Sequence, residues 1–256
     1  MNQNNVWHDW PLILAYHSIS ECRQDALAVH VVDFAAQMSW LHRSDYRSVT
    51  LSDFESQNFK KGERIVIITF DDGYADNYGL AFPILKQYEF VATIFLVTDY
   101  VNTTHVYRWD TTKFTSQCSE AAYHILRWDQ IYEMADYGIE FGSHTCTHPE
   151  LTTISLKESE EEIARSRDDL KSKLGSDTVS FCYPRGKLNM DIIQIVEKAG
   201  YKCAVVTPNR AGIPLGCYTL RRTGIYYHIT PWLFKLKVST LTRRFYERVR
   251  WPFLKS

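Results

Sequence analysis

The chain has 256 residues, of which 45% are hydrophobic and 23% are charged, and this composition is ordinary for a globular protein with one sizeable core. Its net charge of −1 indicates no polyanionic partner, so we expect no nucleic-acid binding. No stretch resembles a signal peptide or the roughly 20 apolar residues of a spanning helix. The six cysteines are scattered without a Cys-x-x-Cys pair, so we expect reduced thiols and a cytoplasmic location.

Apolar runs alternate with amphipathic stretches along the whole chain. In chain order, β-prone runs predict strands at residues 12–16, 46–51, 65–70, 91–97, 139–142, 179–183 and 201–207. Amphipathic stretches predict helices from residue 33, from about residue 77, and over 129–137, 156–174 and 190–199. Residues 99–127 are irregular and predict a long loop. The alternation is typical of a parallel α/β domain, in which reactive groups gather at the carboxyl ends of the strands.

The strand that begins at Ile65 is apolar and β-branched, which suits a strand buried on both faces, and it ends in Asp71-Asp72-Gly73. Two carboxylates at the end of a buried strand are costly unless a metal ion, a proton or a catalytic role compensates them. The alternative is an exposed turn, with Asp76 or Asn77 capping the helix that follows.

The strand at 139–142 leads into His144-Thr145-Cys146-Thr147-His148. On a helical turn, the spacing of His144 and His148 would put both imidazoles on one side, within reach of one ion. Two histidines and one aspartate make a facial site for Zn²⁺ or a similar divalent metal, with positions left open. A second aspartate beside such a site could take a proton from water. These residues therefore predict a metal-assisted hydrolase.

The segments TFDDG (69–73) and HTCTH (144–148) resemble the first two motifs of the polysaccharide deacetylases, carbohydrate esterase family four, which share a chitooligosaccharide-deacetylase-like domain. The similarity continues through LAYHSI, FDDGYADNY, LRWDQIYEM, GIEFGSHTCTHPEL and FCYPRG, and it covers roughly residues 11–226. It implies a single-domain, distorted (β/α) barrel with about seven parallel strands.

The resemblance also implies the roles of individual residues. Asp72, His144 and His148 would hold the metal, and Asp71 would be the general base that acts on an N-acetyl carbonyl. The third motif would lie near residues 183–186, where the backbone N–H of Arg185 would help to stabilise the oxyanion.

The chain departs from the family at several points. Many members have an arginine at the position of Cys182 that holds the catalytic aspartate, and this chain lacks it, as some poly-N-acetylglucosamine deacetylase relatives do. A fourth motif is not evident. His228, in IYYHIT, is the candidate for the histidine acid of the fifth motif, although a surface histidine near a strand end is an equal alternative. The role of His17, another histidine at a strand end, is open.

Aromatic side chains near these loops could stack on sugar rings, although most aromatic residues of a domain this size belong to the core. The candidates are Tyr74, Tyr78, Trp109, Trp128 and Tyr183, with Tyr183 and Trp128 favoured over the others.

The composition changes after residue 230, which separates a catalytic domain (1–230) from a tail (231–256). The tail has one acidic residue, Glu247, and seven basic residues, Lys235, Lys237, Arg243, Arg244, Arg248, Arg250 and Lys255. On a helical wheel, apolar residues share one face, namely Phe234, Val238, Leu241, Phe245 and Val249. This pattern is typical of a helix that lies on an anionic membrane surface. The alternative is a last helix that packs on the barrel.

We therefore expect a metal-dependent deacetylase of an N-acetylated carbohydrate, in a polysaccharide, an oligosaccharide or a lipid-linked glycan. One alternative is an amidohydrolase that acts on a small non-sugar amide. A second alternative is a pseudoenzyme that binds glycan or metal without turnover.

Overall fold

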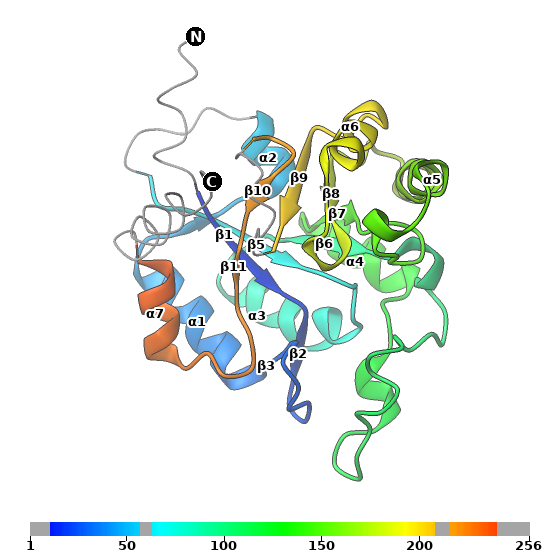
Figure 1. The fold of residues 1–256 in the computed structure, drawn as a ribbon. Helices are drawn as coiled ribbons and strands as arrows, with labels where there is room; N and C mark the ends of the chain where they lie inside the picture. The colour runs from blue at the N-terminus through cyan, green and yellow to red at the C-terminus, as the bar shows by residue number, and fades with distance from the viewer. Residues whose placement is uncertain (1–10, 57–62, 208–215, 240–256) are drawn as a thin grey trace, which may run out of the picture.

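The computed structural model describes residues 11–56, 63–207 and 216–239 (Figure 1). Its centre is a parallel sheet with the strand order β10-β9-β8-β7-β6-β5-β1-β11. These strands are β1 (Leu12–Tyr16), β5 (Ile65–Phe70), β6 (Thr93–Leu96), β7 (Glu140–Ser143), β8 (Ser180–Cys182), β9 (Cys203–Val206), β10 (Leu220–Arg221) and β11 (Thr223–Gly224).

The sheet closes through one short segment. β10 pairs with β9, β11 pairs with β1, and only Arg222 separates β10 from β11 in the chain. If this segment is counted as one strand, the described residues form a barrel of seven parallel strands, to which β4 (Arg47–Ser48) adds a short pairing with β5. The predicted distorted (β/α) barrel is confirmed.

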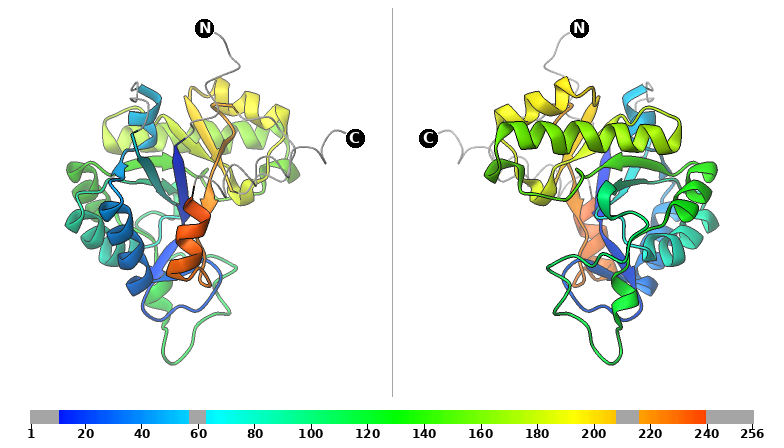
Figure 2. Two further views of the ribbon diagram at one scale, coloured as in Figure 1. Left: turned by 90° about the vertical axis from the view of Figure 1, so that its left-hand side faces the viewer. Right: turned by 90° about the vertical axis from the view of Figure 1, so that its right-hand side faces the viewer.

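Helices cover the outside of the barrel (Figures 1 and 2). They are α1 (Val31–Arg43), α2 (Leu51–Ser56), α3 (Phe82–Gln87), α4 (Trp128–Tyr137), α5 (Leu156–Leu174), α6 (Met190–Lys198) and α7 (Pro231–Val238). Short turns of helix are η2 (Asn77–Ala81), η3 (Thr98–Tyr100), η4 (Glu120–Tyr123), η5 (Leu151–Thr153) and η6 (Pro184–Gly186). The predicted bounds of the helix at 156–174 agree with those of α5.

β5 is buried on both faces, as its unbroken apolar run predicted. On one face, Ile68 belongs to the cluster that contains Phe34 and Met38 of α1. On the other face, Ile67 packs with a second cluster inside the barrel that contains Phe95 of β6. Burial of both faces holds the end of β5 in place, and this end carries the two aspartates.

The predicted strand at 46–51 is wrong in extent, because only Arg47–Ser48 pairs and Leu51 already begins α2. A second small sheet, formed by β2 (Ser18–Ser20) and β3 (Ala28–His30), was not predicted. Both strands are only three residues long, which is too short for a clear alternation of apolar and polar residues.

The expectation that all cysteines are reduced is wrong for one pair. Cys22 and Cys118 form a disulfide across 96 positions of sequence, whereas Cys146, Cys182, Cys203 and Cys217 are free. The disulfide ties the segment between β2 and β3 to the long loop at 99–127, which projects from one end of the barrel (Figure 2). Spacing in sequence could not reveal this pair, because only the fold brings the two loops together.

The beginning of the proposed tail packs on the barrel. α7 lies beside α1 (Figures 1 and 2), Phe234 and Val238 are buried in the main core, and the Phe234 ring meets that of Trp40 edge to face at 5.8 Å. For Phe234 and Val238, the alternative of a last helix that packs on the barrel is therefore confirmed. Residues 240–256, with the rest of the apolar stripe, lie outside the described residues, and the membrane contact stays a prediction.

Among the residues that the structure describes, none of the helices combines the length and the apolar character needed to cross a bilayer.

Candidate active site

The end of β5 delivers two buried carboxylates. Asp71 and Asp72 are only 4% and 3% exposed, so the exposed-turn interpretation is wrong. The backbone of Asp72 is in the left-handed region, with φ of 71°, and the next residue, Gly73, has φ of 67°. A Cβ atom on Gly73 would lie 2.8 Å from the Leu96 side chain, so both the positive φ and this close contact favour glycine here. The hydroxyl of Tyr107 donates to the Asp72 carbonyl at 2.7 Å.

The histidine loop after β7 is not helical, contrary to the picture of a helical turn. Thr145 and His148 both have positive φ, 69° and 61°. The carboxylate of Glu162 on α5 accepts hydrogen bonds from the backbone N–H groups of Cys146 and Thr147, each at 2.9 Å. This loop geometry still brings the imidazoles of His144 and His148 to a centroid distance of 4.7 Å.

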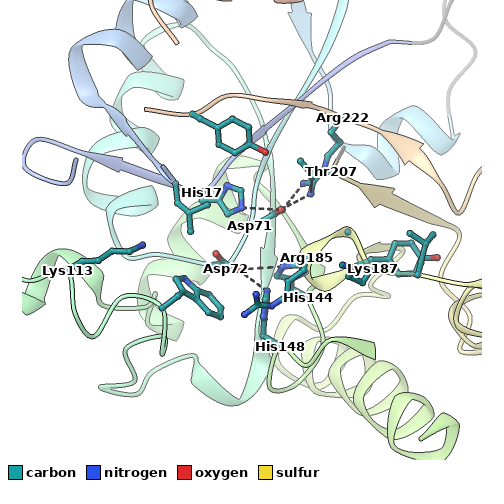
Figure 3. Close-up of a pocket in the computed structure, with 16 residues that line it drawn as sticks. His17, Asp71, Asp72, Lys113, His144, His148, Arg185, Lys187, Thr207 and Arg222 are labelled. Carbon is teal, nitrogen blue, oxygen red and sulfur yellow. Dashed lines mark hydrogen bonds and ion pairs between the residues drawn. The ribbon is translucent and has the colours of Figure 1, made fainter. Parts of the chain in front are cut away.

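Asp72, His144 and His148 converge on one point, as predicted (Figure 3). The Nε2 atoms of both histidines lie 3.5 Å from Oδ1 of Asp72. Ligands that bind one Zn²⁺ at about 2.0–2.1 Å in tetrahedral geometry are about 3.4 Å apart. Both distances to Asp72 match this separation, and the three ligand atoms all lie within 4.8 Å of one another, so the group can hold one divalent ion.

The chemistry of these three groups also fits a metal ion. Burial, followed by the charges of Asp71 and Asp110, raises the pKa of Asp72 well above its ordinary value, and the charges of Arg23 and Arg222 do not offset this effect. Burial lowers the pKa of both histidines, which keeps the imidazoles neutral and able to coordinate. Nδ1 of His144 is 2.8 Å from the Cys182 carbonyl, which leaves Nε2 for the metal.

Asp71 has a different environment from Asp72. Burial raises its pKa, but the charge and the hydrogen bonds of Arg222 outweigh this effect and hold the pKa well below its usual range. The guanidinium of Arg222 donates to both carboxylate oxygens of Asp71 at 2.7 Å, and it also contacts Thr207. Asp71 is therefore ionised at neutral pH, as a general base must be.

Arg222 was not identified from the sequence, and it supplies the contact that the chain seemed to lack. Cys182 occupies the expected position of the arginine, with its thiol 3.5 Å from Oδ1 of Asp71. The guanidinium instead comes from the segment between β10 and β11, 151 positions away from Asp71. Arg222 lies between two strands of only two residues each, and no local sequence pattern indicates that its side chain would bind Asp71.

The histidine beside Asp71 is His17, at the end of β1, and not His228. Nε2 of His17 is 3.8 Å from Oδ2 of Asp71, and His17 lines the same pocket (Figure 3). Burial lowers its pKa to about 4, with the Asp71 charge opposing this shift. His228 is exposed and is not among the residues that line the pocket.

The turn after β8 adds the third wall of the site. Arg185 sits in the left-handed region with φ of 57° and lines the pocket. In the described chain, four of the seven non-glycine residues with positive φ belong to the three loops of this site: Asp72, Thr145, His148 and Arg185. Such strained backbone clusters where the surrounding structure imposes a geometry for function.

The pocket has a volume of about 620 Å³ and unites all three loops. Of the two favoured aromatic residues, Tyr183 lines it and Trp128 does not, and the candidate Tyr74 does not line it either. Trp128 begins α4 and stacks on Tyr132, and Tyr74 is fully buried, with its hydroxyl on Asp110 at 2.6 Å. Trp109 of the long loop lines the pocket instead, 4.9 Å from the His148 ring.

The chain is similar to proteins of one known family. The family model described as polysaccharide deacetylase matches residues 58–204. The YxkH protein of Bacillus subtilis (strain 168), whose name places it among polysaccharide deacetylases, is 34% identical over 217 residues, which are 83% of this chain and 70% of that protein.

Two further proteins extend the comparison. A Staphylococcus epidermidis protein named poly-β-1,6-N-acetyl-D-glucosamine N-deacetylase is 27% identical over 195 residues, 71% of this chain and 62% of its own length. The structure of the Streptococcus pyogenes deacetylase PplD in complex with acetate superimposes with a TM-score of 0.73 at 25% identity, covering 90% of this chain and 98% of PplD. This chain belongs to the polysaccharide deacetylase family.

Proposed function

We propose that this chain is a metal-dependent hydrolase that removes N-acetyl groups from an amino sugar of a glycan. The observation that carries the proposal is one pocket in which Asp71 is kept ionised beside the three-ligand group of Asp72, His144 and His148. An ionised carboxylate beside a three-ligand metal site is placed to take a proton from a water molecule that such a metal would activate.

The reaction adds water to the acetyl carbonyl carbon and breaks the carbon–nitrogen bond, giving acetate and a free amine. Asp71 takes one proton from the attacking water. A divalent ion held by Asp72, His144 and His148 would lower the pKa of that water and polarise the carbonyl. The backbone N–H of Arg185, on the turn after β8, would donate to the developing oxyanion.

We propose that His17 delivers the proton to the leaving amine. Its pKa of about 4 makes the imidazole neutral at pH 7, so it must gain a proton during the reaction before it can protonate the leaving amine. Asp71, 3.8 Å away, is the group that holds the proton taken from water. His17 therefore acts as a carrier between the base and the leaving group, and the exposed His228 has no part in the reaction.

The test is acetate release from a panel of N-acetylated oligosaccharides, measured with and without added divalent metal. Asp71→Asn should keep the metal and lose about 10²- to 10⁴-fold in turnover, the usual worth of a general base. Asp72→Asn should lose both metal and turnover. His17→Gln should lose turnover, and the matched change His228→Gln should not.

Two results would contradict a metal-dependent glycan deacetylase, and a third would indicate a pseudoenzyme. One is acetate release that survives complete removal of the metal. The other is activity confined to small non-sugar amides, which would favour the amidohydrolase instead. Glycan binding without any turnover would favour a pseudoenzyme.

A further inference from the structure

One wall of the pocket pairs an arginine with a tryptophan. The guanidinium carbon of Arg185 lies 5.5 Å from the ring centroid of Trp109, and the Trp109 ring lies 4.9 Å from that of His148. Both side chains line the pocket. Arg185 therefore places a positive charge one side chain away from a metal ligand.

Arg185 differs from the other cations of the pocket. Three cationic side chains that line the pocket already face a carboxylate, in the pairs Arg222–Asp71, Lys113–Asp110 and Lys187–Glu150. Within the described parts of the chain, no carboxylate oxygen lies within 4.0 Å of the Arg185 guanidinium, and the residue is exposed. Its charge is thus not neutralised by a neighbouring acid there.

The ring beneath Arg185 is firmly supported. Trp109 stacks on Tyr107 at 4.4 Å, and its indole N–H donates to the hydroxyl of Tyr74 at 3.2 Å. An aromatic face attracts a guanidinium but does not replace a hydrogen-bond acceptor for its N–H donors. A supported, exposed guanidinium with free hydrogen-bonding capacity is suited to a carboxylate or phosphate oxygen pair.

We propose that Arg185 and Trp109 form an anion subsite, and that the substrate is a glycan in which the acetylated amino sugar carries, or lies next to, a carboxylate or a phosphate. The inference rests on the proposed deacetylase function and names its substrate class. The ring of Trp109 holds the guanidinium over the pocket, and the guanidinium binds the anionic oxygens. Arg185 thus has two separable contributions, because its backbone N–H serves the oxyanion and its side chain selects the substrate.

The test compares matched N-acetylated oligosaccharides that differ only in one group: neutral, carboxylated or phosphorylated. The readout is the ratio of kcat/KM for the anionic glycan to kcat/KM for the neutral glycan. In Arg185→Gln this ratio should fall about 10- to 100-fold, the worth of a hydrogen bond to a charged group. Arg185→Lys should give an intermediate ratio. Lys187→Gln removes a charge from the same pocket and should leave the ratio unchanged.

The carboxylated and the phosphorylated glycans identify which anionic group the subsite binds, because the wild-type enzyme should prefer the glycan that carries this group. The preference should also weaken as salt rises. Equal use of neutral and anionic glycans by the wild-type enzyme, or the same ratio in Arg185→Gln, would overturn the subsite while leaving the deacetylase intact.

A second readout does not depend on turnover. Calorimetric titration of metal-loaded wild-type protein would use the same glycans with a hydroxyl in place of the acetamido group, which cannot be hydrolysed. Tighter binding of the anionic glycans, lost in Arg185→Gln, supports the subsite even if no acetate is released. Equal binding of neutral and anionic glycans overturns it.

Discussion

Two adjacent carboxylates acquire opposite properties because their partners differ. The guanidinium of Arg222 contacts Asp71 and lowers its pKa. Asp72 instead faces two neutral imidazoles, and its pKa is raised. Successive residues at the end of a strand point in different directions, so neighbours in sequence need not share an environment. The chemistry of the site depends on this separation of a base from a ligand.

Removal of Arg222 should show how much Asp71 depends on it. In Arg222→Gln, burial acts on Asp71 without the compensating cation, so its pKa should rise. Activity needs ionised Asp71, so the acid limb of the pH–rate profile should move to higher pH and the melting temperature should fall. Breaking a buried pair typically costs about 3–5 kcal/mol.

The matched control is Arg165→Gln, which breaks an exposed ion pair in which Arg165 donates two hydrogen bonds to Asp99. Exposed pairs contribute about 0–1 kcal/mol, so neither the profile nor the melting temperature should change much. An unshifted acid limb in Arg222→Gln would mean that Arg222 does not tune Asp71.

Asp76 gives a pH-dependent prediction for stability. It occupies the N-cap position of η2, but its side chain makes no capping hydrogen bond, because its carboxylate accepts hydrogen bonds from Ser18 and from the Ile19 N–H. Burial raises its pKa to about 7, against the effect of these hydrogen bonds. A raised folded-state pKa means that protonated Asp76 stabilises the fold below about pH 4, and that this contribution is lost as the pH rises through 7.

Asp76→Asn cannot ionise, so its stability relative to wild type should increase from pH 5 to pH 8, measured by urea denaturation with a chelator present. The control Asp136→Asn changes an exposed aspartate on α4. The difference in stability between this variant and the wild type should be the same at pH 5 and at pH 8. A pH-independent difference for Asp76→Asn would refute the assignment.

At the scale of elements, the long loop at 99–127 supplies the Trp109 wall, and several long-range contacts fasten this loop. The disulfide Cys22–Cys118 is one of them. Beside it, the buried guanidinium of Arg23 donates to Asp110 at 3.3 Å. The chain between β2 and β3 therefore holds a wall of the pocket, although it contributes little to the barrel itself.

The disulfide can be tested by counting thiols. Denatured protein prepared without reductant should show four free thiols out of six cysteines. Replacing Cys22 and Cys118 by serine should lower stability by about 2–4 kcal/mol, because the link closes a long loop. Replacing the exposed, free Cys217 is the control and should have little effect. Six reactive thiols in the denatured, unreduced protein would exclude the link.

This disulfide bears on the expected location of the protein. Disulfides are typical of oxidising compartments, whereas the scattered cysteines had suggested the cytoplasm. The cytoplasmic location stays a prediction, and thiol counting on protein taken directly from cells would test it.

At the scale of the whole molecule, the outer face of α7 bears on the predicted membrane contact. Phe234 and Val238 face the core, but Trp232 and Leu236 are 68% and 44% exposed, four residues apart on one side of the helix. The basic residues of 240–256 follow directly in the chain. Exposed apolar side chains that are followed in the sequence by bases are typical of a segment that binds an anionic bilayer.

We therefore predict that the protein sediments with anionic vesicles, less with neutral ones, and less as salt rises. Leu236→Ser should weaken sedimentation at every salt concentration. Leu156→Ser removes a leucine of similar exposure from α5 and should not weaken it. Equal sedimentation of both variants, or none for the wild type, would exclude a membrane role for this face.

The sequence by itself determined the alternation of strands and helices in a parallel α/β domain, the paired aspartates and the paired histidines, whereas the barrel was implied by the family resemblance. The sequence signals are local, because an unbroken apolar, β-branched run such as 65–70 suits a strand buried on both faces, and the motifs follow directly from strand ends. Family resemblance added the roles of Asp72, His144 and His148, and the observed geometry suits those roles.

Only the tertiary structure decided which other groups complete the site. Arg222, His17 and Trp109 reach it from the closing segment, the first strand and the long loop, and Cys22 meets Cys118 only because two loops project from the same end of the barrel. These contacts join residues up to 151 positions apart. Their geometry exists only after the sheet closes, so no local pattern of apolar and polar residues can encode it.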